Sequence, residues 1–108
     1  MATSIIPYPL TDKTRVELND IANISTGDIT LSRAFDAACR WLMIEAHVAT
    51  SYCIGIVPAF HVVTGRTLFV PIGKGYVRLD LTNLSAGGTI NVAENTSGYN
   101  VRRLIMVY

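Results

Sequence analysis

The chain has 108 residues, enough for one domain, of which 50% are hydrophobic and only 16% are charged. Average domains carry about 25% charged residues, so apolar or neutral polar groups must cover much of this surface. A small domain of this composition usually buries part of its surface against a partner. The formal net charge of +1, with the basic residues scattered along the chain, argues against binding to nucleic acid or to an anionic membrane.

The ends and the apolar stretches give no targeting signal. The first residues lack a basic segment followed by an apolar one, so we expect no signal peptide. The most apolar stretch, residues 37–63, is interrupted by charged residues and a proline and is not expected to span a membrane. For Cys39 and Cys53, buried free thiols and a disulfide both remain open.

Residues 1–14 differ from the rest because two prolines stand among large apolar side chains. Pro7 and Pro9 lack an amide donor and push the residue before each toward extended geometry. This segment is therefore neither a helix nor a central strand. We expect an extended arm that lies on this subunit or on a neighbour, with a disordered terminus as the alternative. Residues 15–108 are expected to form one β-domain.

Short β-prone segments begin directly after this arm. Residues 14–18 alternate weakly, and residues 28–31 form a short run after a turn signal. Residues 32–39 have a helix-like composition, and Ser32 is the candidate N-cap of one or two turns.

The clearest predicted strand spans residues 40–49. Its alternate positions Leu42, Ile44, Ala46 and Val48 are apolar, which predicts one face turned inward. The opposite face is mixed, so we expect it to lie against something else; it carries Trp41, Met43, Glu45 and His47.

The second half of the chain predicts further strands separated by Gly, Pro, Asn and Ser. They span residues 52–57, 60–63, 67–72, 76–81, 89–93 and 101–108, and Gly73-Lys74-Gly75 predicts a hairpin turn. With almost no helix, this spacing indicates an all-β fold. We expect an antiparallel β-sandwich or jelly roll of about seven or eight short strands with at most one short helical turn.

The residues that carry chemistry do not gather in a catalytic or metal-binding pattern. His47 and His61 are not at ligand spacing, and Cys39 and Cys53 form no CxxC motif. No GxSxG elbow occurs, and most carboxylates fall at turns, where they cap the backbone. We therefore expect no enzyme activity, no metal and no cofactor.

Aromatic and soft apolar side chains remain as candidates for function, because such residues are enriched at interfaces. For each of them, ordinary packing in the core is the alternative. The candidates are Trp41, Met43, Tyr52, Tyr76, Tyr99 and Tyr108.

Four stretches carry a likeness to a known type of protein: Arg40–Ala46, Phe69–Ile72, Gly75–Leu81 and Ala86–Glu94. Their layout, which covers residues 40–108, resembles small β-sandwich proteins of tailed-phage virions, namely capsid cement or decoration proteins and fibre modules. The resemblance implies no catalysis, no cofactor, trimerisation, and contacts with the major capsid protein or adjacent virion proteins. It also implies a particle assembled in the host cytoplasm. It transfers no functional residue.

The leading hypothesis is thus a non-enzymatic virion structural protein, such as a capsid cement or decoration protein, that oligomerises and binds its neighbours. Its expected anchors are Ile5, Tyr8, Leu10, Trp41 and Tyr108. The alternative is a carbohydrate- or receptor-binding sandwich module of a fibre or tail tip, in which exposed Trp41 or tyrosines stack on sugar rings. Coplanar exposed aromatic rings near Asp, Asn or Arg would favour that alternative.

Overall fold

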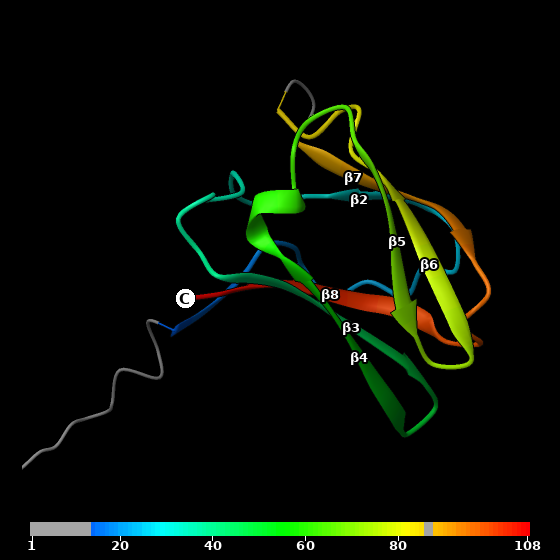
Figure 1. The fold of residues 1–108 in the computed structure, drawn as a ribbon. Coiled ribbons are helices and arrows are strands. Elements are labelled where there is room, and N and C mark those ends of the chain that lie inside the picture. The colour runs from blue at the N-terminus through cyan, green and yellow to red at the C-terminus, as the bar shows by residue number, and fades with distance from the viewer. Residues whose placement is uncertain (1–13, 86–87) are drawn as a thin grey trace, which may run out of the picture.

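The computed structural model describes residues 14–85 and 88–108, and these residues form two antiparallel four-stranded sheets packed face to face (Figure 1). Sheet A has the order β1-β8-β3-β4, with β1 at Arg15–Glu17, β8 at Asn100–Val107, β3 at Trp41–Val48 and β4 at Ser51–Pro58. Sheet B has the order β2-β7-β6-β5, with β2 at Gly27–Thr30, β7 at Thr89–Asn95, β6 at Gly75–Asp80 and β5 at Thr67–Ile72. The described residues therefore confirm the all-β sandwich.

The core lies between the two sheets because alternate residues of each strand point inward. On β3 the predicted residues Leu42, Ile44 and Ala46 are buried, but Val48, which was expected to face inward with them, is 47% exposed beside the β3–β4 turn. Sheet B contributes the fully buried side chains Val77, Leu79, Ile90 and Val92 to the same core. Each strand thus packs one face in the core, and its other face points to the outside of the sandwich.

Two tight hairpins join neighbouring strands. The β5–β6 hairpin turns at Gly73 and Lys74, as the sequence predicts, and Gly73 has a φ of 59°. A Cβ at Gly73 would also lie 2.7 Å from the carbonyl oxygen of Ser97, so only glycine fits. The β3–β4 hairpin turns at Ala49 and Thr50, where Ala49 adopts a φ of 52°. Positive φ is the geometry that two-residue hairpin turns require.

Two of the predicted elements are wrong. Residues 32–39 form turns and not a helix, and the Ser32 hydroxyl donates to the carbonyl oxygen of Leu18 (3.0 Å) instead of capping a helix. The Asp36 carboxylate accepts from the amide of Ala38 (2.9 Å). Asp side chains that bond nearby backbone amides favour turns over helices, which explains the difference.

The strand predicted at residues 60–63 is instead a 3-10 helix at Ala59–His61. Only Ala59 and Val62 are buried in this stretch. Their spacing of three residues matches the period of a 3-10 helix and not that of a strand.

The two cysteines are both free thiols, which decides between the two alternatives left open by the sequence. Cys39 is buried and Cys53 is half-buried, and burial is the main reason that the pKa of each thiol is raised. The anchors expected at Ile5, Tyr8 and Leu10 lie outside the described residues.

Candidate interaction surface

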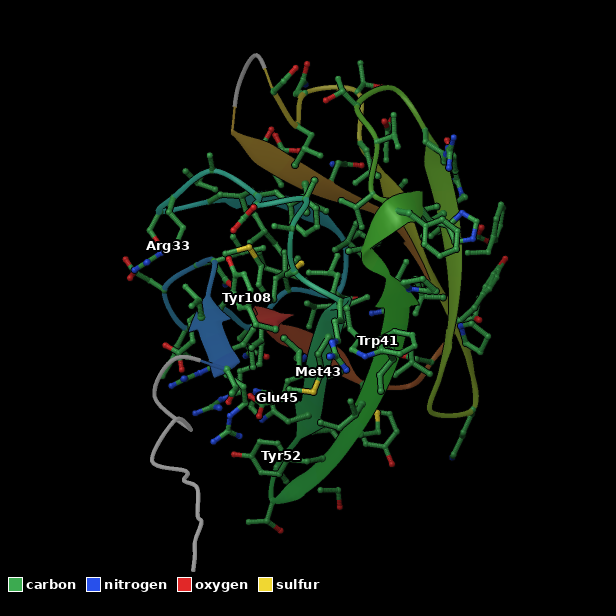
Figure 2. The ribbon with its side chains drawn as sticks, turned by 60° about the vertical axis from the view of Figure 1, so that its left-hand side comes forward. Arg33, Trp41, Met43, Glu45, Tyr52 and Tyr108 are labelled. Carbon is green, nitrogen blue, oxygen red and sulfur yellow. The ribbon has the colours of Figure 1, made fainter. Side chains whose placement is uncertain are left out.

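The outward face of sheet A carries large apolar side chains on two neighbouring strands. Figure 2 shows Trp41, Met43, Glu45 and Tyr52 projecting from β3 and β4 on this side of the molecule. In the β3–β4 register, Met43 lies opposite Ile56 and Glu45 lies opposite Ile54. The exposed fractions are 42% for Trp41, 54% for Tyr52, 47% for Ile54 and 56% for Ile56. We call these four residues, together with Met43, the apolar face.

A β-bulge in β8 places two consecutive arginines beside the apolar face. Glu45 of β3 pairs with Arg103, but the next residue, Ala46, pairs with Val101, so Arg102 is the extra residue. A bulge re-aims the side chain of the extra residue. Arg102 can therefore point outward like its neighbour Arg103, where strict alternation would send one of them into the core.

The charges at this margin neutralise one another. Arg102 donates to the Glu45 carboxylate at 2.7 Å, and this hydrogen bond is the main reason that the pKa of Arg102 is raised. Arg103 donates to Glu17 of β1. The guanidinium of Arg102 also lies 5.6 Å from the centre of the Tyr52 ring, a cation–π distance. On this side the apolar face is thus bordered by charges that are paired with one another.

Strand β4 forms one edge of sheet A, and within the described residues it pairs only with β3. It is eight residues long, carries no charged side chain and has no irregularity in its pairing with β3. Native edge strands are usually protected by shortness, charge, proline or a bulge. Pro58 is the only such device in β4, and it stands at the last position of the strand.

The β4 edge adjoins β5, one of the two edge strands of sheet B. A Cβ added to Gly55 would lie 2.9 Å from Cγ1 of Val70, so the two strands approach closely there. Phe60 and Phe69 are 74% and 62% exposed beside this approach. A shallow depression of about 250 Å³ separates the two edges and is lined by Ile56, Val57, Pro58, His61, Leu68, Phe69, Val70 and Pro71.

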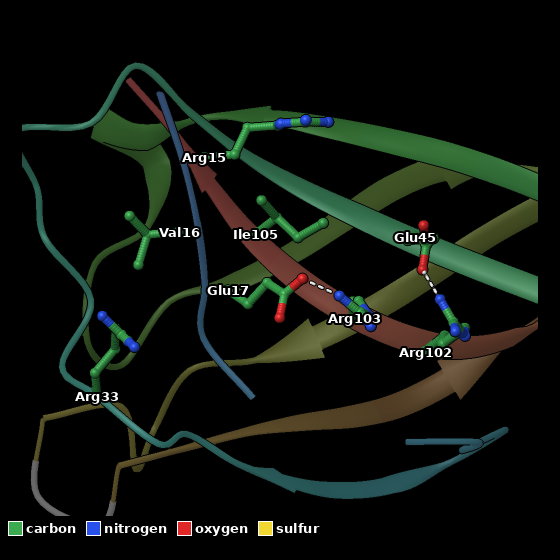
Figure 3. A pocket seen from close by; sticks show the side chains of 8 residues that line it. All are labelled: Arg15, Val16, Glu17, Arg33, Glu45, Arg102, Arg103 and Ile105. Carbon is green, nitrogen blue, oxygen red and sulfur yellow. Dashed lines mark hydrogen bonds and ion pairs between the residues drawn. The ribbon is translucent and has the colours of Figure 1, made fainter. Parts of the chain in front are cut away.

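A second, more polar depression of about 650 Å³ lies on the β1 side of sheet A (Figure 3). Its arginines differ in their partners. Arg102 and Arg103 are paired with glutamates, whereas no ion pair joins Arg15 or Arg33 to another residue of the described chain. The depression is lined by Arg15, Val16, Glu17, Arg33, Glu45, Arg102, Arg103 and Ile105.

The structure separates two of the anchors expected from the sequence. Trp41 lies on the apolar face, but the Tyr108 hydroxyl donates to the Asp36 carboxylate at 2.7 Å, which ties the ring to the loop before β3. This hydrogen bond is the main reason that the pKa of Tyr108 is raised to about 12. Of the other aromatic candidates, Tyr76 meets Phe69 edge-on and Tyr99 packs against the core.

The histidines and acidic residues do not converge on a reactive centre in the part of the chain that the structure describes. His47 stacks on Tyr52, with ring centres 5.6 Å apart, and His61 lies against Phe60 at 4.4 Å. No group of three or more His, Cys, Asp or Glu residues is placed to hold a metal ion in residues 14–85 and 88–108. In the same residues, no helix has the length and apolar character needed to cross a membrane.

Ile54, Ile56, Phe60 and Phe69 are surface residues that the sequence does not single out. Ile54 and Ile56 alternate with the buried Gly55 and Val57, and they are exposed because they point to the outer face of sheet A. The bulge was not predicted from the sequence, although two adjacent arginines in the mostly apolar β8 are a signal that could have indicated it.

Comparison with known proteins adds no family to this picture. No protein-family model, no curated protein sequence and no solved structure matches the chain. What the protein does is therefore inferred from its own surface.

Proposed function

We propose that the chain is a non-enzymatic assembly protein that binds protein subunits, copies of itself included, through the apolar face and the β4 edge. The observation that carries this proposal is the exposure of Trp41, Tyr52, Ile54 and Ile56 side by side on β3 and β4. Soluble monomers rarely expose contiguous apolar patches larger than a few hundred square ångströms, and larger ones mark interaction sites.

The distribution of side chains on this surface supports the same function. Protein interfaces have a core rich in aromatic residues and methionine, surrounded by a polar rim. The apolar face supplies Trp41, Tyr52 and Met43, and the pairs Glu45–Arg102 and Glu17–Arg103 stand at its margin. Paired rim charges suit a close, static contact better than an encounter steered by charge.

The virion supplies the setting for this binding in our proposal. Residues 40–108 resemble small β-sandwich virion proteins of tailed phages, and the apolar face falls within that stretch. Cementing or decorating a shell requires repeated contacts with the major capsid protein or with adjacent virion proteins. We therefore propose that the chain is a capsid cement or decoration protein of a particle assembled in the host cytoplasm. The resemblance implies that its oligomer is a homotrimer.

The mass of the purified protein in solution tests this proposal. Size-exclusion chromatography with light-scattering detection gives the mass of the full chain and of Ile56→Lys over a range of concentrations. We expect an oligomer from the full chain and a shift toward the 11.8 kDa monomer in Ile56→Lys, because a buried unpaired lysine opposes association. Ile21→Lys is the matched control, since Ile21 is exposed outside β4. A full chain that stays monomeric at every concentration contradicts self-assembly.

A second candidate function, carbohydrate or receptor binding, is favoured by the polar depression on the β1 side. Arg15 and Arg33 offer two guanidinium groups, without described ion-pair partners, to an acidic sugar. The rings of exposed Phe69 and half-buried Tyr76 are not coplanar, at 82°, and so make no stacking platform. Glycan-array binding that is lost in Arg33→Ala would support this function, and no binding to any acidic glycan would contradict it.

A further inference from the structure

We propose that residues 5–10 of one copy add as a strand to the β4 edge of a neighbouring copy. This inference rests on the proposed function, because it names the partner as a second copy of the chain and names the segment that binds. It follows from the open edge of β4, from the pattern of the prolines in the arm, and from the place where the arm joins the sandwich.

The receiving edge is the least protected of the four edge strands in the described part of the chain. β1 and β2 have three and four residues, and β5 holds Pro71 within the strand. β4 has eight residues, no charge and no proline before its last position. Its outer N–H and C=O groups therefore form a row that an extended peptide can pair with.

The spacing of the prolines in the arm suits an edge strand. In a strand, the N–H and C=O of successive residues point to opposite sides within the sheet. Pro7 and Pro9 are two apart, so in a strand their missing amides would fall on one side, and Ile6, Tyr8 and Leu10 would present their amides on the other. Prolines occur in edge strands with that amide side turned to solvent, so Ile6, Tyr8 and Leu10 make the pairing side.

Both faces of the added strand would meet apolar surroundings. Side chains of a strand alternate between its two faces, and in this arm every residue from Ile5 to Leu10 is apolar or aromatic. On one side of the β4 edge, Ile54 and Ile56 are exposed on the apolar face. On the other side, the depression toward β5 is lined by Phe69 and Pro71. An arm with one polar face would leave one of these surfaces uncovered.

The junction of the arm with the sandwich favours a neighbouring copy over the same copy. The arm joins β1, and a strand added outside β4 would lie four strand spacings from β1 in the order β1-β8-β3-β4, or about 19 Å. The four links from Leu10 to Thr14 span at most about 14 Å, which is too short for Leu10 to pair with the chain's own β4 edge. Arg15 pairs with Val107, Val107 with Trp41, and Trp41 with Pro58, so β1 begins at the level where β4 ends. An arm that leads into β1 from the chain's own β4 edge would therefore end at that level too, and it would run parallel to β4.

A neighbouring copy imposes neither constraint. Its β4 can be approached from the opposite direction, in the antiparallel pairing that is somewhat more stable per residue. When each copy gives its arm to the next, the contact is heterologous, and such contacts close into rings when the rotation permits. The homotrimer implied by the resemblance is one such ring.

Two adjacent proline substitutions in the full chain separate strand pairing from simple apolar contact. Ile6→Pro removes an amide from the pairing side, whereas Ile5→Pro removes one from the solvent side, and both lose the same side chain. We expect Ile6→Pro to raise the dissociation constant of the oligomer about tenfold or more. We expect Ile5→Pro to raise it far less. Hydrogen exchange of the β4 amides, measured at the same concentrations, should quicken in Ile6→Pro alone.

Each other outcome overturns a stated part of the proposal. Equal weakening by the two substitutions means that the arm binds without strand pairing. Faster exchange at β4 with no change in mass places the arm on its own subunit. An oligomer that neither substitution affects overturns the arm proposal and leaves the proposed function intact, with β4-to-β4 pairing of two copies as the next test. A full chain that is always monomeric overturns both.

Discussion

Arg102 and Glu45 meet at 2.7 Å on the outer side of sheet A, although they stand on different strands and Arg102 has no partner in the β3–β8 register. The bulge in β8 makes this contact, because it adds one residue and turns Arg102 outward. Both side chains are only about one-fifth exposed. The pair therefore closes the margin of the apolar face next to Tyr52.

Breaking this pair should cost more than breaking its neighbour. Glu45→Gln is expected to lower the free energy of unfolding by about 1 kcal/mol, because it weakens a partly buried charged hydrogen bond. Glu17→Gln, whose side chain is about half exposed, is the matched control and should cost less. Urea denaturation at one fixed protein concentration measures both variants. Equal losses would mean that the bulge gives the Arg102–Glu45 pair no special strength.

Gly55 should be intolerant of a larger residue, because β4 and β5 approach closely there. Gly55→Ala places a Cβ 2.9 Å from Cγ1 of the buried Val70, and overpacking of this kind costs about 1–3 kcal/mol. The loss is measured as a shift of the urea midpoint. Val70→Ala in the same chain should relieve part of the clash, so the double variant should lose less than the two single losses combined. Simple additivity would contradict the close approach.

The Asp36–Tyr108 hydrogen bond predicts two pH effects of opposite direction. The bond from Tyr108 is the main reason that the pKa of Asp36 is lowered, so its stabilisation is present above the ordinary pKa of 3.8 and is lost as pH falls further. The pKa of Tyr108 is raised from 10.0 to about 12, so that stabilisation is present below pH 10 and is lost as pH rises toward 12.

Spectrophotometric titration of the tyrosines measures the alkaline effect. Asp36→Asn should bring the late-ionising tyrosine back toward pH 10, because the carboxylate that holds the proton is gone. Tyr108→Phe should remove the ionisation near pH 12 and thereby assigns it. The pKa of Tyr76 is also raised, mainly by its hydrogen bond to Glu94, and this shift should persist in both variants. If the titration curve of Asp36→Asn is the same as that of the full chain, the terminal tyrosine does not bind this loop.

The strands could be predicted from the sequence wherever a β-prone run was bounded by turn residues. β5 begins and ends at the predicted residues 67 and 72, since Gly65 and Gly73 bound a β-prone run. The helix predicted at residues 32–39 is wrong because their Ala-rich composition favours a helix, whereas the Asp36 carboxylate accepts a hydrogen bond from the backbone of a turn. Local propensity was outweighed there by one local hydrogen bond.

Only part of the interaction surface could be predicted from the sequence. The mixed outward face of β3, with Trp41 and Met43, follows from alternation alone. The exposure of Ile54 and Ile56 does not, since residues 52–57 are apolar at nearly every position and do not show which face is turned outward. The place of β4 at the edge also depends on the β3–β8 pairing, which joins residues about sixty apart in the chain and leaves no local pattern.

The measurement that tests the central claim most directly is the solution mass of the full chain beside Ile56→Lys, across a wide concentration range. Assembly through the apolar face and the β4 edge predicts a stable oligomer of the full chain, which Ile56→Lys dissociates while Ile21→Lys does not. An 11.8 kDa monomer for the full chain at every concentration would contradict this account. So would an oligomer that Ile56→Lys leaves unchanged, because the contact would then lie on another surface.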